Sequence, residues 1–153
     1  MLRWLCEGLV SMRKTTLIST TFGLMALAGA ALAHHGDAGR FEDEVSTITG
    51  TVVALQLINP HSGILINVPD ASGKPVTWHV EMEAPQRLQN EFGWNRNTLP
   101  PGTKITVTGR KIKSGAPNMN VTERSRIFLT DTCEEIYHSR DLEAPTEKPA
   151  SCQ

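Results

Sequence analysis

The chain has few aromatic side chains and no excess of basic ones. It holds three Trp, one Tyr and four Phe among 153 residues. So few aromatic rings argue against the stacking platforms that bind single-stranded nucleic acid. The 15 Lys+Arg are balanced by 16 Asp+Glu, which gives a formal net charge of −1. Nucleic acids and anionic membranes are bound by basic faces, so neither is expected as a partner.

Sequence patterns of catalysis are also missing. The glycines follow no phosphate-loop or dinucleotide-binding pattern. Ser62, Ser114 and Cys133 have no nucleophile-elbow context and no base at a readable spacing. We therefore predict no catalytic residue and no organic cofactor, and a binding function is favoured over an enzymatic one.

The N-terminal region has the pattern of a secretory signal. Arg13 and Lys14 precede an apolar run over 17–27, and Ala31-Leu32-Ala33 forms an A-x-A cleavage site. The uncharged run is near the lower length limit for a transmembrane helix, and the cleavage motif favours its removal. We predict a signal peptide over 1–33 and a periplasmic or secreted product. Met12 would itself be a good initiator, so residues 1–11 are excluded from the fold argument.

Two of the three cysteines lie in the expected mature chain. Cys6 is far upstream of the cleavage site, whereas Cys133 and Cys152 remain after it. An even pair in an oxidising compartment predicts a disulfide that closes the C-terminal tail. The alternative is two free thiols on a loose tail.

The mature chain divides into three parts. Residues 34–45 are polar and aperiodic and are predicted to form a flexible arm that contains His34 and His35. Residues 46–129 carry the strand patterns, and residues 130–153 form a charged, Pro-containing tail. Alternation and turn residues predict strands over 46–57, 64–68, 76–82, 104–111 and 120–129, with a short helix over 86–92.

This order of elements predicts the fold. Five strands with one short helix between the third and the fourth match an OB-fold barrel. The first strand is long, and Gly50 with Val52-Val53 marks an expected bulge, as in a strand that serves both halves of a closed barrel. An antiparallel β-sandwich is the alternative. The predicted core is Ile48, Val52, Ile64, Ile66, Val68, Trp78, Val80, Ile105, Val107 and Ile127.

Short motifs along the mature chain occur in a recognisable order. They are the Ala33-His34-His35 start, the Asn59-Pro60-His61 turn, Trp78 with Glu81, and the Pro101-Gly102-x-Lys104 lead. In this order they resemble a family of small exported bacterial proteins of unknown function, over about residues 33–112. The resemblance implies an OB-like fold and export, and it brings no reaction, substrate or site. The region after Ser114 fits that family poorly.

Cleavage after Ala33 would create a candidate metal site. The new N-terminal amine and the imidazoles of His34 and His35 are nitrogen ligands, which copper and zinc both accept. Cleavage after Ala31 would instead place His34 at mature position three, another copper-binding arrangement. The alternative is a flexible polar start that binds metal only incidentally.

A second set of ligands is expected at one end of the second and third strands. If the turn near residues 69–75 sets the register, residue 66 faces residue 78, and residue 64 faces residue 80. His61 then falls beside Glu83, with Glu81 close by, as metal ligands or a proton-transfer pair. The alternative is that His61 only completes the turn. We expect His79 at the solvent or under the helix, with the solvent favoured, and His138 at the solvent. Met119 is expected in a hydrophobic gap rather than on copper.

Two functions from different classes follow. In the first, the protein is an exported binding module that holds copper or zinc through His34, His35, His61 and Glu83. In the second, the barrel binds a small molecule, a saccharide or a partner protein, and the histidines are incidental.

Overall fold

Seven strands and one short α-helix make up most of the described chain. The structure is a computed structural model, and it describes residues 39–141 and 148–152. The predicted signal peptide over 1–33, His34 and His35 lie outside these ranges. In chain order the elements are β1 (Phe41–Gln56), β2 (Gly63–Pro69), β3 (Pro75–Glu81), α2 (Pro85–Phe92), β4 (Lys104–Ile112), β5 (Asn118–Asn120), β6 (Arg126–Leu129), β7 (Glu135–His138) and the 3-10 turn η2 (Ala150–Cys152).

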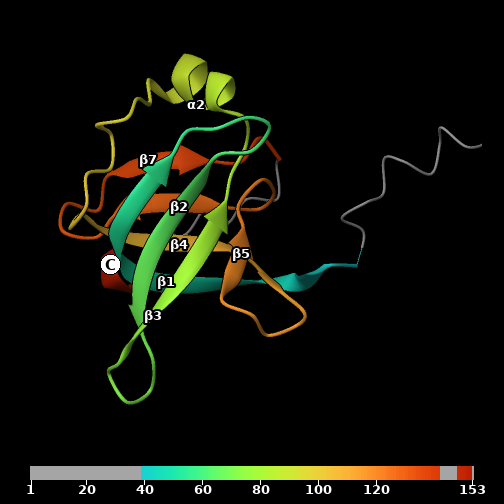
Figure 1. Cartoon of the computed structure of the whole chain (residues 1–153), viewed down its shortest axis with the longest axis vertical. Helices are drawn as coiled ribbons and strands as arrows, with labels where there is room; N and C mark the ends of the chain where they lie inside the picture. Colours follow the sequence, from blue (N-terminus) through green and yellow to red (C-terminus); the bar gives the residue numbers. More distant parts are fainter. Residues whose placement is uncertain (1–38, 142–147, 153) are drawn as a thin grey trace, which may run out of the picture. The chain divides into compact units, whose positions relative to one another are not determined.

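The first five strands close into a barrel. The strand order is β1-β2-β3-β5-β4, and β4 pairs back onto β1. β3 and β5 run parallel, and the other neighbours are antiparallel. With α2 between β3 and β4, this confirms the predicted OB-fold-like barrel and sets aside the sandwich alternative. Figure 1 shows α2 across one end of the barrel and the β2–β3 turn at the opposite end.

β1 is long enough to join both halves of the barrel. Its first part pairs with β4 and its last part with β2, and the register shifts between Val52 and Ala54. This shift is the expected bulge. At Gly50 a β-carbon would lie 2.7 Å from the backbone oxygen of Asn67, so the strands approach more closely there than a side chain allows. β1 begins at Phe41, earlier than expected, because the Phe41 side chain is buried.

The core follows the alternation of the strands. Eight of the ten predicted core residues are buried, while Val68 and Trp78 are partly buried and pack against the others. The core also contains buried residues outside the predicted set, which come from β5, the helix, the loops and the tail. These are Met82, Leu88, Trp94, Leu99, Met119, Val121 and Tyr137.

The fifth predicted strand is interrupted. β5 ends at Asn120 and β6 begins at Arg126, so one continuous strand over 120–129 is wrong. In the break, Asn120 Oδ1 accepts hydrogen bonds from the backbone N–H and the hydroxyl of Thr122. Arg124 has φ 47, and its backbone N–H donates to the Asp141 carboxylate. Side chains satisfy the backbone here in place of a strand partner.

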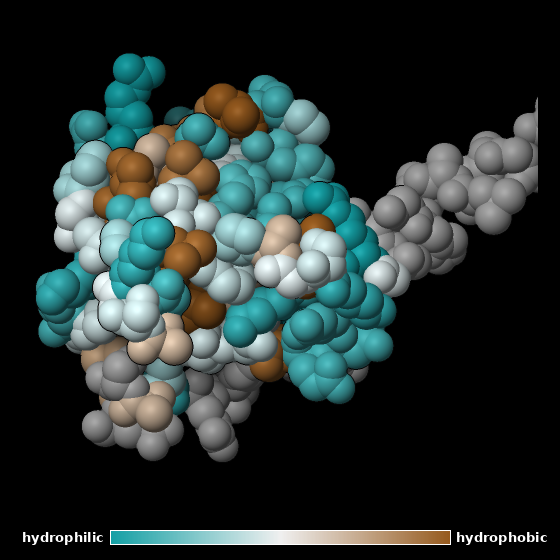
Figure 2. Space-filling view, turned by 60° about the horizontal axis from the view of Figure 1, so that its bottom comes forward, coloured by the Kyte–Doolittle hydropathy of each residue, from teal (hydrophilic) through white to brown (hydrophobic). Residues whose placement is uncertain are grey.

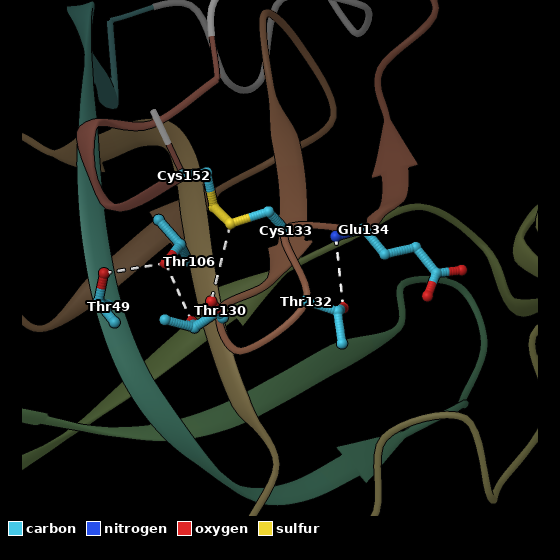
Figure 3. The surroundings of a disulfide bond; sticks show 7 residues. All are labelled: Thr49, Thr106, Thr130, Thr132, Cys133, Glu134 and Cys152. Atoms are coloured by element: carbon cyan, nitrogen blue, oxygen red, sulfur yellow. Dashed lines mark hydrogen bonds between the residues drawn. A yellow bond between two sulfur atoms is a disulfide. The ribbon is translucent and has the colours of Figure 1, made fainter.

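The C-terminal segment is built onto the barrel. β6 pairs with β4 and β7 pairs with β6, which extends the sheet beyond the five barrel strands. Cys133 and Cys152 form the predicted disulfide, with their Cα atoms 5.4 Å apart. Figure 3 shows this bond beside Thr130, whose hydroxyl joins a hydrogen-bonded row with Thr106 and Thr49.

Hydrophilic residues cover much of the visible surface. Figure 2 shows one face on which hydrophobic residues form small groups among hydrophilic ones. Among the described residues, Val53 and Ile58 are the large hydrophobic side chains that are exposed. No helix within residues 39–141 and 148–152 has the length and apolar character needed to cross a membrane.

Candidate functional site

His61 and Glu81 lie together beside α2, at one end of the β2–β3 hairpin. The observed register pairs Ile66 with Trp78 and Ile64 with Val80, as expected. His61 Nδ1 lies 3.6 Å from Glu81 Oε1, and the His61 side chain is 53% exposed. The peptide bond before Pro60 is cis. The arrangement leaves an accessible imidazole next to a carboxylate.

Glu83, the other predicted carboxylate, has a different partner. β3 ends at Glu81, and the chain then turns into α2, where the Glu83 carboxylate forms an ion pair with Arg87. Arg87 also binds Glu91 one turn further along the helix, at 2.8 Å. The carboxylate nearest to His61 is therefore that of Glu81, because Glu83 is held by the helix.

His79 is packed more tightly than a surface histidine. Its ring lies over Gly63, where a β-carbon would be 2.6 Å from His79 Nε2. Its Nδ1 lies 3.4 Å from the side-chain nitrogen of Asn118 on the neighbouring strand β5. The sequence did not single out Gly63 or Asn118, since their roles depend on pairing between distant strands.

Met119 and His138 are separate from this pair, as expected. Met119 is fully buried in the core. His138 Nδ1 lies 2.9 Å from Glu135 Oε1 on the strand β7. Within the described ranges, no group of three or more His, Cys, Asp or Glu side chains is placed to hold a metal ion. His34 and His35 lie outside those ranges.

A second feature is a hollow of about 460 Å³ between the end of β1 and α2. We call it the β1–α2 hollow. Its apolar lining is Leu55, Leu57, Pro85 and Trp94. Its polar lining is Gln89, Asn95 and Arg96. A lining that combines aliphatic and aromatic surface with amide and guanidinium groups can hold a ligand that is partly apolar and partly polar.

The wall of the hollow after α2 is firmly anchored. Gly93 ends the helix in a left-handed conformation, φ 69, with its N–H donating to the Gln89 carbonyl. The Trp94 indole N–H then donates to the carbonyl of Ile136 at 3.0 Å. The Trp94 ring also packs edge-on against Tyr137. Trp94 is therefore fixed by the helix on one side and by β7 on the other.

Behind this wall, burial has the largest effect on the pKa of Tyr137. Loss of water around the phenol raises the pKa of Tyr137 to about 12. Its hydroxyl donates to the carbonyl of Val121 at 2.7 Å. On α2 the pKa of Glu91 is lowered, chiefly by a hydrogen bond from Arg140. Tyr137 thus stays neutral as a buried packing group, and Glu91 stays ionised at the surface.

Comparison with known families identifies the family of this chain. Residues 22–120 match the Family of unknown function (DUF6152). The chain belongs to this family. No curated protein and no solved structure matches it.

The matched segment contains both features of the site. It covers the barrel strands β1 to β5 and helix α2, and with them His61, Glu81 and the whole lining of the hollow. β6, β7 and the disulfide lie beyond the last matched residue. The segment that the family model matches thus carries the candidate site, and β6 and β7 lie outside it.

Proposed function

We propose that the protein is an exported binding module whose ligand occupies the β1–α2 hollow. The hollow itself carries this proposal, because about 460 Å³ falls in the range of small-molecule sites. Its lining consists of Leu, Pro, Trp, two amides and one guanidinium. These groups pack against and hydrogen-bond a ligand, so the function proposed is binding and not a reaction.

Export is part of the proposal. It rests on Arg13 and Lys14, the apolar run over 17–27 and the Ala31-Leu32-Ala33 motif. The Cys133–Cys152 disulfide supports it, because such bonds persist in oxidising compartments such as the bacterial periplasm.

Binding to the hollow is tested with two probes of equal chain length, octanoate and 1-octanol. Titration of the purified protein, followed by NMR, should shift the Trp94 indole and the Asn95 amide signals saturably with at least one probe. Leu57→Asp places a charge in the lining and should abolish the shifts. Ile58→Asp is the matched control, since Ile58 is exposed and lies outside the lining. If neither probe shifts these signals, or if Leu57→Asp and Ile58→Asp abolish the shifts equally, the proposed function is rejected.

A second candidate function is binding of copper or zinc, and the His61–Glu81 pair favours it. An imidazole and a carboxylate 3.6 Å apart supply two ligands of types that zinc accepts. The amine and imidazole of His34, with His35, would add the nitrogen ligands that copper favours. Glu81 takes the place expected for Glu83, because Arg87 holds the Glu83 carboxylate.

The metal candidate is tested by titrating Cu²⁺ and Zn²⁺ into the processed protein and its variants. His34→Ala, His61→Ala and one extra residue before His34 should each weaken stoichiometric binding. His138→Ala is the matched control, because that imidazole is equally exposed but bound to Glu135. Affinity should fall as the pH drops toward about 6, since protons compete for the imidazoles. Equal binding by all variants, or binding without stoichiometry, excludes this site.

A further inference from the structure

Arg96 differs from the other arginines of the described ranges. Each of those others contacts a carboxylate, a backbone carbonyl or an aromatic ring, whereas Arg96 has no hydrogen bond, ion pair or ring contact there. The engaged arginines and their partners are Arg40 with Phe41, Arg87 with Glu83 and Glu91, Arg110 with Glu123, Arg124 with the Asp43 carbonyl, Arg126 with Glu135, and Arg140 with Glu91.

This guanidinium lines the β1–α2 hollow, and no acidic residue shares the lining. Two side-chain amides, from Gln89 and Asn95, also line it. Asn95 Oδ1 accepts a hydrogen bond from the Asn97 N–H. The polar lining of the hollow therefore includes a positive charge and amide hydrogen-bond donors.

The backbone around Arg96 is held by local hydrogen bonds. The Asn95 N–H donates to Thr98 Oγ1 at 2.8 Å, and the Thr98 N–H returns a bond to the Asn95 carbonyl at 3.0 Å. Buried Trp94 and Leu99 fix the two ends of this loop. The backbone that carries Arg96 is thus already ordered, so binding at this side chain does not require the loop to be ordered as well.

We infer that the ligand of the hollow is an organic carboxylate with a short apolar body. This inference rests on the function proposed above. Arg96 binds the carboxylate through its planar fork of donors, and Leu55, Leu57 and Trp94 cover the apolar body. One guanidinium matches the single charge of a carboxylate, whereas a phosphate monoester carries nearly two charges.

The same two probes test the ligand class. Octanoate and 1-octanol have the same number of carbons and differ in charge. Hydrogen bonds to charged groups are stronger than those between neutral groups. Octanoate should therefore bind at least about tenfold more tightly than 1-octanol. Arg96→Gln should weaken octanoate binding by about the same factor and should weaken octanol binding much less, because the alcohol has no charge for the guanidinium to neutralise. Arg96→Lys keeps the charge but loses the fork, and should fall between the two.

Lys74→Gln is the matched control for charge. Lys74 is an exposed residue of the β2–β3 turn, at the other end of the barrel from α2 (Figure 1). Removing the Lys74 charge should change the affinity for each probe by no more than about twofold, because salt screens a charge at this distance. Equal affinities for the two probes in the unmodified protein, or equal weakening of both by Arg96→Gln, overturn the carboxylate assignment while the binding function stands. If neither probe binds, both proposals fall.

Discussion

The imidazole of His79 lies directly over Gly63, at a distance that excludes a side chain at position 63. A β-carbon there would be 2.6 Å from His79 Nε2. The contact joins β2 to β3, and Asn118 extends it to β5. Residues of three neighbouring strands, β2, β3 and β5, thus pack together on the outer face of the barrel.

Gly63→Ala should lower the free energy of unfolding by about 1–2 kcal/mol, because the new methyl group displaces the His79 ring. Gly50→Ala should cost more, since the atom that its β-carbon meets is a backbone oxygen of Asn67, which cannot rotate away. Denaturant unfolding measures both changes. His79→Ala should relieve much of the Gly63→Ala cost in a double-mutant cycle. An additive result would contradict the contact.

Opening the disulfide should destabilise the protein by at most about 3 kcal/mol, because the bond closes a loop of moderate length. Cys133→Ala/Cys152→Ala, compared with the oxidised protein in denaturant unfolding, gives the value. In the processed protein, thiol titration under denaturing, non-reducing conditions should detect no free cysteine. Two titratable thiols would refute the pairing.

Stability should fall at alkaline pH as Tyr137 ionises. Burial raises its pKa to about 12, above the unfolded value of about 10, so the neutral form is favoured in the fold. The resulting stabilisation is fully present below pH 10 and is lost as the pH rises from about 10 to about 12, by about 2–3 kcal/mol at most.

Tyrosinate absorbance measures this directly, because the chain has a single tyrosine. The midpoint should move from about 12 in the folded protein to about 10 in denaturant. A folded-state midpoint near 10 would show that the ring is accessible to water. Tyr137→Phe should remove the titration and, separately, the hydrogen bond to Val121.

Processing should occur between Ala33 and His34, because Ala31-Leu32-Ala33 places small residues where signal peptidase requires them. Intact-mass analysis of exported protein gives the new N-terminus. A mature chain that begins at Leu32, or one that is never cleaved, would contradict the assignment.

Local chemistry made the barrel predictable from the sequence. Asp70 accepts hydrogen bonds from the Ser72 and Lys74 N–H groups, and this turn sets the register of β2 and β3. Pro85 and Gly93 mark the limits of α2, where a fixed φ begins a helix and a left-handed residue ends it.

Features that depend on distant contacts were less predictable. The break between β5 and β6 depends partly on Asp141, which lies beyond the predicted strand. Tyr137 enters the core from a tail whose charged composition suggests solvent. Glu81 rather than Glu83 lies beside His61, because β3 ends at Glu81 and the Glu83 carboxylate pairs with Arg87. The hollow is assembled from the end of β1 and the stretch from Pro85 to Arg96, which are distant in sequence, so no short motif could indicate it.

The hydrogen bond from Trp94 to the Ile136 carbonyl makes the C-terminal segment a support for one wall of the β1–α2 hollow. Trp94 belongs to the segment that the family model matches, whereas Ile136 lies in β7, beyond it. Trp94 and β7 are therefore structurally coupled, so removal of the C-terminal segment should loosen this wall although it deletes none of the lining residues.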